Sequence, residues 1–275
     1  MIIASDLDRT LVYSQRAIEQ LGVPLGTVLK PVEEKDGFTV GYMTETAYNT
    51  LFELCRHCIF IPVTTRTTAQ YKRFTIFEKE LTLPYAITFN GAAILYKGEP
   101  LLEWSEHIFS QFRWESAHRD ELQDGIKRSG FHINGQLKSA ENLFFYYILE
   151  TSLSLSEQQN LSEIVSNYGW KVSLQGRKLY FIPKAINKGA ALTYIINREE
   201  LPVLAGAGDS VLDWDFLTSC QNRIVPAHGE LALMNLNKTA SITTRAGILA
   251  GEQILQYFLT ILKHSFKNKQ VNTSK

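Results

Sequence analysis

Short apolar runs alternate with helical patterns at both ends of this chain, and this alternation constrains its fold more than any other feature. Near the N-terminus the apolar runs cover residues 1–5, 59–63 and 85–89, and helical spacing covers 44–57 and 69–81. Strands that are joined through helices form parallel sheets with helices on both faces. The sequence therefore predicts an α/β fold built on a doubly wound parallel sheet.

The C-terminal part of the chain continues this pattern. Apolar runs at 201–207 and 223–226 alternate with helices that we expect from Asn187 to about 197 and over 246–262. Asn187 is a residue type that caps helix N-termini. Both ends of the chain are therefore expected to contribute to one core.

The middle of the chain is richer in aromatic residues and has a different pattern. Hairpins are expected at 92–104 and 170–182, each around a central glycine, with a strand over 142–151 and a helix over 156–168. This pattern indicates an α+β domain inserted into the α/β core.

The predicted boundaries follow from these patterns. Residues 1–90 form the first part of the core, 91–184 the inserted α+β domain, and 185–275 the second part of the core with a polar C-terminal tail. A smaller hairpin is expected at 32–42, because Asp36-Gly37 is a strong signal for a tight turn.

The charge balance excludes some classes of partner. The chain has 28 basic and 28 acidic residues and a net charge of zero, which gives no electrostatic reason to bind nucleic acid or an anionic membrane. No signal peptide or apolar run of membrane-spanning length is recognisable, so a cytoplasmic setting is expected. Cys55 and Cys58 form a C-x-x-C pair that could be redox-active or bind zinc, but their surroundings favour core residues.

Two acidic residues follow the first apolar run. Asp6 and Asp8 would lie at the carboxyl edge of the sheet, which is where ligands bind in open α/β folds. Taken alone, the pair could equally be a solvated loop or an Asx turn.

A second acidic cluster follows the strand expected at 201–207. Asp209 and Asp213 would lie near Asp6 and Asp8, and four carboxylates at neighbouring strand ends repel one another unless a cation neutralises them. All-oxygen ligation suits Mg²⁺. The segment Gly206-Ala207-Gly208 could instead indicate a dinucleotide site, but the third glycine of that motif is missing.

Two further residues suit a phosphoryl group. Thr64 would place a hydroxyl at the end of the second strand, where it could donate to a phosphoryl oxygen. Lys188 would open a helix, a position that the helix dipole makes unfavourable for a cation unless it faces an anion.

These segments together resemble the four motifs of the haloacid dehalogenase superfamily, in the same order. The resemblance is closest to the Cof-type enzymes of subclass IIB, with a C2-type cap, such as sucrose-phosphate and mannosylphosphoglycerate phosphatases. The matching segments are 5–10, 63–66, 182–192 and 208–213, together with the hinge-like 89–92. The chain departs from the pattern at Arg9 and Thr65, where glycine is usual, and at Leu212, where asparagine is common.

The resemblance implies a Mg²⁺-dependent phosphatase with an inserted cap domain, acting on a sugar phosphate or related metabolite. Asp6 would be the nucleophile that forms an aspartyl-phosphate and Asp8 the general acid/base, while Thr64 and Lys188 stabilise the phosphoryl group. The metal would be held by Asp6, Asp8, Asp209 and Asp213. The expected substrate-binding residues are Thr10, Thr65, Arg66, Asn90 and Ser210. Arg9, which departs from the family pattern, could bind substrate or alter the turn, and Arg177 and Lys178 at the expected cap hairpin could face substrate or belong to a solvated turn.

Alternatives remain open at this point. A phosphomutase or phosphotransferase of the same fold would have the same residues, and a non-catalytic phosphate-binding relic is a further alternative. The expected partner is a small phosphorylated molecule, with no nucleic acid and no membrane, and the chain is expected to be a monomer or homodimer.

Overall fold

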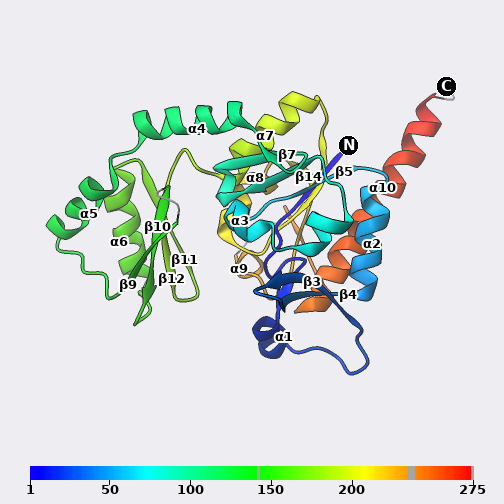
Figure 1. Ribbon diagram of the computed structural model, residues 1–275, viewed down its shortest axis with the longest axis horizontal. Coiled ribbons are helices and arrows are strands. Elements are labelled where there is room, and N and C mark those ends of the chain that lie inside the picture. Colours follow the sequence, from blue (N-terminus) through cyan, green and yellow to red (C-terminus); the bar gives the residue numbers. More distant parts are fainter. Residues whose placement is uncertain (141–142, 235–238, 274–275) are drawn as a thin grey trace. The chain divides into compact units, whose positions relative to one another are not determined.

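The computed structural model describes residues 1–140, 143–234 and 239–273 (Figure 1). The chain divides into two compact units. The larger unit contains Met1–Leu101 and Lys188–Lys275, and the smaller contains Leu102–Asn187. The expected insert at 91–184 is therefore shifted at both ends. The first shift arises because strand β7 (Ala93–Tyr96) pairs with β6 (Tyr85–Thr88) inside the larger unit.

A parallel sheet forms the centre of the larger unit, as predicted. Its strand order is β15-β14-β13-β1-β5, and every neighbouring pair in it is parallel. The strands are β1 (Ile2–Ser5), β5 (Ile59–Pro62), β13 (Val203–Ala207), β14 (Cys220–Val225) and β15 (Ser241–Ile242). Because β1 lies between β5 and β13, the residues that follow these three strands meet at one edge of the sheet.

Helices cover both faces of this sheet. On one face α2 (Glu45–Cys55) and α10 (Ile248–Thr273) lie side by side (Figure 1). Ala205 and Ala207 of β13 share the hydrophobic core of that face. Gly206 between them faces the opposite side of the sheet, since a Cβ there would lie 3.1 Å from the side chain of Leu217 in α8 (Val211–Leu217). Helix α8 packs beside α7 (Lys188–Glu199), so the sheet is doubly wound.

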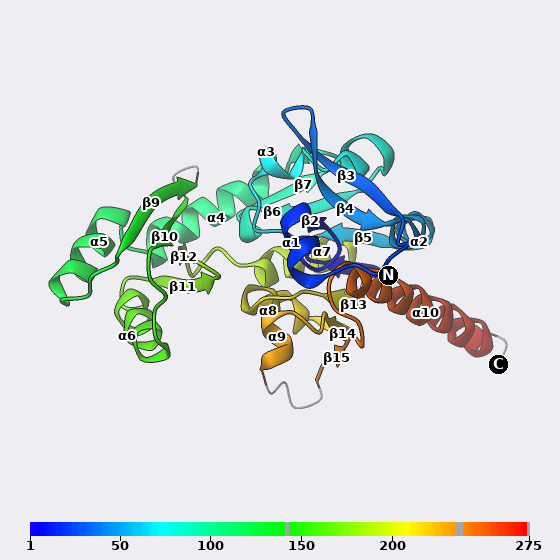
Figure 2. The same cartoon turned by 90° about the horizontal axis from the view of Figure 1, so that it is seen from below.

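The hairpin expected at 32–42 is present. Strands β3 (Leu29–Lys35) and β4 (Phe38–Thr44) pair through a turn in which Asp36 and Gly37 have φ of 52° and 80° (Figure 2). This left-handed pair is typical of the two-residue turns that match strand twist. The short β2 (Tyr13–Ser14) extends this sheet on the β4 side, and α1 (Gln15–Leu21) follows it.

Two sequence predictions, for 69–81 and for 100–104, are wrong. The helix expected at 69–81 is broken into α3 (Thr68–Tyr71) and a π-helical turn, η1 (Ile76–Glu80). The break has a tertiary cause, because the carbonyl of Arg73 accepts a hydrogen bond at 2.9 Å from the backbone N–H of Glu34 in β3. The second error concerns 100–104, where β8 (Glu99–Pro100) ends early and a helix follows.

Two short elements complete the larger unit: the 3₁₀ turn η2 (Phe89–Gly91) and helix α9 (Glu230–Leu233). Helix α10 runs to Thr273, well beyond the expected end at 262, so most of the polar tail is helical. No described helix is both long enough and apolar enough to cross a membrane.

The smaller unit is a four-stranded antiparallel sheet with helices. Its strand order is β11-β12-β10-β9. The strands are β9 (Gly135–Ala140), β10 (Phe144–Leu149), β11 (Trp170–Gln175) and β12 (Lys178–Pro183); the helices are α4 (Leu102–Glu115), α5 (Arg119–Arg128) and α6 (Leu155–Ser166). Phe145 and Phe181 stack in its core with ring centroids 4.8 Å apart. The β11–β12 hairpin and α6 were predicted, whereas α4, α5 and β9 were not.

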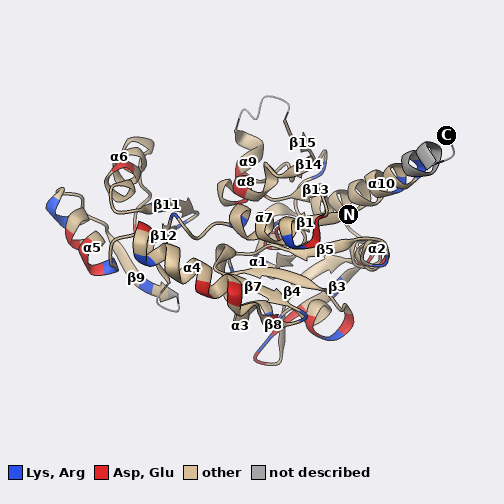
Figure 3. Ribbon diagram, turned by 90° about the horizontal axis from the view of Figure 1, so that it is seen from above, with Lys and Arg blue, Asp and Glu red and all other residues tan. Residues whose placement is uncertain are grey.

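The charges on α5 explain how so polar a segment forms a helix. Asp120 and Glu121 lie in its first turn, and Lys127 and Arg128 lie in its last turn (Figure 3). Acidic groups at the N-terminus and basic groups at the C-terminus stabilise the helix dipole.

Candidate active site

The carboxyl ends of three neighbouring strands bring the predicted residues together. Asp6 directly follows β1, and its backbone N–H donates to the carbonyl of Ala207 in β13 at 2.9 Å. Thr64 follows β5, and Asp209 follows β13. The edge of the sheet that the sequence indicated therefore carries an acidic cluster.

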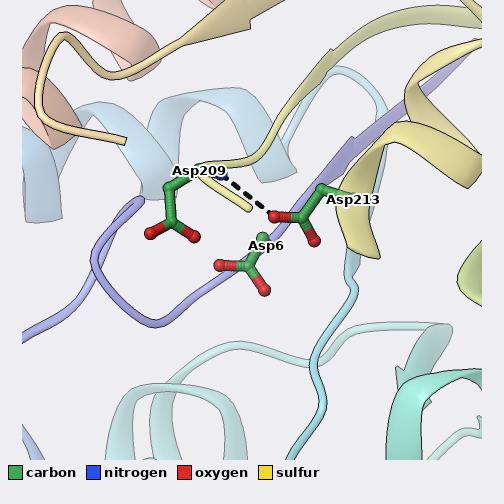
Figure 4. Close-up of side chains that lie close together, drawn as sticks. All are labelled: Asp6, Asp209 and Asp213. Carbon is green, nitrogen blue, oxygen red and sulfur yellow. Dashed lines mark hydrogen bonds between the residues drawn. The ribbon is translucent and has the colours of Figure 1, made fainter. Parts of the chain in front are cut away.

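Three carboxylates form the centre of this cluster. Asp6, Asp209 and Asp213 each offer one oxygen, and these atoms lie within 4.8 Å of one another (Figure 4). Asp6 is 5% exposed and Asp213 is fully buried. Like charges this close in a buried site require a neutralising group.

Lys188 supplies one positive charge. Its ammonium group is buried at the start of α7 and donates to Asp6 Oδ1 at 2.8 Å and to Asp213 Oδ1 at 2.5 Å. Burial acts to lower the pKa of Lys188, but the two carboxylates outweigh it and raise this pKa above its usual value. The next residue, Gly189, permits the close packing of α7 on α8, since a Cβ there would lie 2.4 Å from the carbonyl oxygen of Asp215.

Asp213 organises the loop after β13. Its Oδ2 accepts from the backbone N–H groups of Asp209 and Ser210, at 3.0 and 2.9 Å, and from the Ser210 hydroxyl at 3.2 Å. Gly208 allows this arrangement, because a Cβ there would lie 2.4 Å from that of Asp213. Both carboxylate oxygens of Asp213 are thus engaged, and Ser210 caps α8.

Asp6 is held on both of its oxygens. Besides the contact of Oδ1 with Lys188, Oδ2 accepts from the buried Thr10 hydroxyl at 3.0 Å. Burial, with a contribution from Asp213, raises the pKa of Asp6 from 3.8 to about 7, although Lys188 opposes the shift. Burial and the charge of Asp6 also raise the pKa of Asp209 well above its usual value.

The cluster has the chemistry of a divalent cation site. Three carboxylates face one ammonium group; burial is the main cause of the raised pKa values of Asp6 and Asp209, and the neighbouring carboxylates add to it. The carboxylate of Asp209 makes a single long contact within the described chain, at 3.9 Å to Arg9 Nε. Oxygen ligands with few protein groups suit Mg²⁺, so these residues fit the predicted metal.

Asp8 lies outside this cluster. Its side chain is 43% exposed, and Arg66 binds it through both carboxylate oxygens, at 2.7 and 2.6 Å. The third nitrogen of Arg66 donates to Glu33 of β3, which is almost fully buried and which also pairs with Arg73 at 3.1 Å. Sequence reasoning missed Glu33, because an acid in a polar hairpin looks like an exposed residue.

Arg9 has an unusual backbone. Its φ is 61°, in the left-handed region that favours glycine. Its carbonyl accepts from the hydroxyl of Tyr13 and from Nε2 of His228, both at 2.9 Å. His228 Nδ1 accepts from the N–H of Gly247 at 3.1 Å, which fixes the neutral tautomer with its proton on Nε2. Neither Tyr13 nor His228 was predicted from the sequence.

Thr64 and Asn90 lie together at the end of β5. Thr64 is buried, and its carbonyl accepts from the N–H of Asn90 at 3.0 Å. Asn90 is 1% exposed, and in the part of the chain that the structure describes its side-chain amide has no hydrogen-bond partner. Burying an unpaired amide costs roughly 1–3 kcal/mol, a cost that a polar group of a ligand would offset. Thr65 follows Thr64 and is partly exposed.

The two predicted cap residues belong to the smaller unit. Arg177 lies in the β11–β12 turn, and its Nε donates to the carbonyl of Leu149 at 2.9 Å. The ammonium of Lys178 lies 5.8 Å from the ring centre of Tyr146. These contacts stabilise the hairpin, and the substrate-binding role of both residues stays a prediction.

Two other sequence features have structural roles. Cys55 and Cys58 are free, and burial raises the pKa of each thiol to about 12. Thiols that are this difficult to ionise are poor metal ligands and poor nucleophiles. Leu212, where asparagine was expected, is buried in α8.

Comparison with known proteins gives one relative by sequence and several by structure. No protein-family model matches the chain. A phosphoglycolate phosphatase of Staphylothermus marinus is 25% identical over 170 residues, which are 58% of this chain and 65% of that protein. The chain thus matches slightly less than two thirds of this curated relative.

The structural neighbours cover nearly the whole chain. The sucrose-phosphatase of Synechocystis, solved with sucrose and phosphate, has a TM-score of 0.68 at 17% identity, over 95% of this chain and 97% of that one. A subclass IIB sugar phosphatase of the haloacid dehalogenase superfamily has a TM-score of 0.61 at 12% identity, over 94% and 98%. The haloacid dehalogenase-like hydrolase yhjK of Bacillus subtilis has a TM-score of 0.54 at 15% identity, over 95% and 89%. At these identities the likeness concerns the fold.

Proposed function

Because the chain has the fold of the haloacid dehalogenase superfamily, we propose that it is a Mg²⁺-dependent phosphomonoester hydrolase that works through an aspartyl-phosphate. One observation carries this proposal: the Asp6 carboxylate is held on both oxygens, by Lys188 and Thr10, beside Asp209 and at the end of β1. A fixed carboxylate at the ligand-binding edge of the sheet supports a nucleophilic attack on a phosphorus atom.

The roles of the neighbouring residues follow from their contacts. The ammonium of Lys188 lies 2.8 Å from Asp6 and can stabilise charge on the phosphoryl group that Asp6 receives. Asp213 positions Lys188 and the loop that carries Asp209. Mg²⁺, when bound by Asp6, Asp209 and the backbone of Asp8, supplies charge neutralisation for the transferring group.

Asp8 is proposed as the general acid/base. Its carboxylate is partly exposed, so it can reach the leaving oxygen and later the hydrolytic water. The two hydrogen bonds from Arg66 orient it. We therefore propose a positioning role for Arg66, instead of the direct substrate-binding role expected from the sequence.

Thr64 and Asn90 complete the proposed phosphoryl site. The Thr64 hydroxyl accepts from the N–H of Arg66 at 3.2 Å, which leaves its own proton free to donate. The unpaired amide of Asn90 would gain its hydrogen bonds from the bound substrate. We propose a sugar phosphate or a related small metabolite as substrate, because structural neighbours include sugar phosphatases.

The test is phosphate release from p-nitrophenyl phosphate and a panel of metabolites, with Mg²⁺ and with excess EDTA. We expect phosphate release to require Mg²⁺. Asp6→Asn should lower the rate of release by about a thousandfold or more, since the nucleophile is lost. Asp36→Asn in the exposed β3–β4 turn is the matched control, because asparagine accepts the φ of 52° found there. If Asp6→Asn releases phosphate as fast as the wild type, the proposal is wrong. If the product is an isomer of the phosphate ester, the protein is a mutase.

A further inference from the structure

Arg9 has a backbone conformation that glycine adopts more easily than arginine does. The left-handed φ of 61° disfavours an arginine. The hydrogen bonds that its carbonyl accepts from Tyr13 and His228, at 2.9 Å each, hold it there. A strained conformation that its surroundings fix in this way is found most often at functional sites.

The guanidinium of Arg9 has N–H groups available to bind a ligand. Its side chain is 42% exposed, and its one contact with an acid is at 3.9 Å to Asp209 Oδ2, beyond hydrogen-bond distance. Arg66 differs, since Asp8 and Glu33 occupy its nitrogens and its side chain is 16% exposed. Within the residues that the structure describes, no acceptor lies within hydrogen-bond distance of the Arg9 guanidinium.

The location of these donors is defined by the loop. Arg9 lies between Asp8 and Thr10, and Thr10 contacts the proposed nucleophile. Its guanidinium lies beside Asp209, at the rim of the acidic cluster. A planar guanidinium with free N–H groups matches the geometry of a carboxylate or a phosphate.

We infer that Arg9 binds a second anionic group of the substrate. The preferred substrates are then phosphomonoesters that also carry a carboxylate or another phosphate. This inference rests on the proposed function, in which Asp6 takes the first phosphoryl group. The alternative is that Arg9 only offsets the charge of Asp209, in which case its loss affects all phosphomonoesters by the same factor.

The test compares substrates that differ in one anionic group. Suitable pairs are phosphoglycerate with glycerol phosphate, and a hexose bisphosphate with the corresponding hexose monophosphate. The readout is the ratio of kcat/KM within each pair. We expect the wild type to favour the more anionic member of at least one pair and Arg9→Gly to lower that ratio about tenfold, the loss expected for a charge-assisted contact. Arg9→Lys keeps the charge and should retain most of the preference.

The variants and controls keep the outcome clear. Glycine relieves the strain at φ 61°, so Arg9→Gly is expected to fold, which thermal melting verifies. Arg56→Gln removes an exposed arginine at the end of α2, at the opposite edge of the sheet, and should leave the ratios unchanged. An equal effect of Arg9→Gly on both members of each pair, or no preference in the wild type, overturns the inference.

Failure of the proposed function is detected separately. If the wild type releases no phosphate even from p-nitrophenyl phosphate, the hydrolase proposal fails. Calorimetric titration with phosphoglycerate and glycerol phosphate in Mg²⁺ then decides the role of Arg9. The inference is supported if the wild type binds phosphoglycerate more tightly than glycerol phosphate and Arg9→Gly abolishes this difference. It is overturned if each protein binds the two ligands with equal affinity.

Discussion

Arg66 donates two hydrogen bonds to the carboxylate of Asp8, from Nε to Oδ2 at 2.7 Å and from Nη2 to Oδ1 at 2.6 Å. The guanidinium is itself fixed by buried Glu33 and by the ring of Phe74, whose centre lies 4.5 Å from Cζ. The orientation of Asp8 therefore depends on the β3–β4 hairpin, although no residue of that hairpin belongs to the acidic cluster.

Glu33→Gln should weaken both the fold and the reaction. Glu33 neutralises Arg66 and Arg73 in a buried position, so its loss leaves excess positive charge and should lower the free energy of unfolding by about 1–3 kcal/mol. Because Asp8 loses its fixed orientation, kcat should fall while KM changes little. Urea unfolding and steady-state kinetics measure the two effects.

The neighbouring Glu34 is the control for this change. It is exposed and pairs with Lys79 at 3.6 Å, so Glu34→Gln should lower the free energy of unfolding by at most about 0.5 kcal/mol. A Glu33→Gln protein that is destabilised but keeps its kcat would show that the hairpin supports the fold and has no influence on Asp8.

Lys188→Met should be more damaging than any surface substitution. It removes the cation between Asp6 and Asp213 and leaves two buried carboxylates facing each other. Breaking a buried pair from one side costs about 3–5 kcal/mol. Thermal unfolding should show this loss, and phosphate release should disappear.

The double variant Lys188→Met with Asp213→Asn separates charge from packing. Removing one carboxylate relieves the repulsion, so part of the lost stability should return while activity does not. If the double variant is no more stable than Lys188→Met, the carboxylate repulsion is not the cause of the destabilisation.

How much of this site the sequence predicted depends on whether a residue directly follows an apolar strand. Asp6, Thr64 and Asp209 lie at one edge of the sheet, because each follows an apolar strand and parallel strands end at one edge. Glu33, Tyr13 and His228 were missed, since their approach to the site depends on how the β3–β4 hairpin, strand β2 and the loop before α9 pack. No local pattern of residue types encodes that packing.

The fold shows the same division. The alternation of strands and helices predicted the parallel sheet, and Asp36-Gly37 predicted the separate β3–β4 hairpin. The break between α3 and η1 could not be predicted, because it follows from a hydrogen bond between Arg73 and a strand some forty residues earlier in the chain. Helix α5 was missed because its residues are mostly polar and its stabilising charges lie at its ends.

Binding of Mg²⁺ should stabilise the protein more at high pH than at low pH. The pKa of Asp6 rises from 3.8 in the unfolded chain to about 7 in the folded one, so ionising this group opposes folding. Without metal, its contribution to stability is greatest below pH 3.8 and is lost as the pH rises through about 7. Mg²⁺ binds the ionised carboxylate, so the rise in Tm on adding it should grow over the same interval.

Thermal melts with EDTA or Mg²⁺ across this pH range provide the measurement. In Asp6→Asn the pH dependence of the Mg²⁺ effect should flatten, because the titrating group is gone. A rise in Tm that is constant with pH in the wild type would contradict this account.

Asn90→Gly should separate ligand binding from stability. The buried amide has no partner in the described chain, so its removal should not lower the free energy of unfolding by more than about 1 kcal/mol, and glycine suits the φ of 59° at this position. If the amide binds the substrate, KM and the inhibition constant of inorganic phosphate should each rise about tenfold, as expected for a lost hydrogen bond in a closed site. Asp36→Gly, at an exposed position with φ 52°, controls for the effect of glycine in a left-handed conformation. A large loss of stability in Asn90→Gly with unchanged KM would assign the amide to the stability of the η2 turn between β6 and β7 instead of to substrate binding.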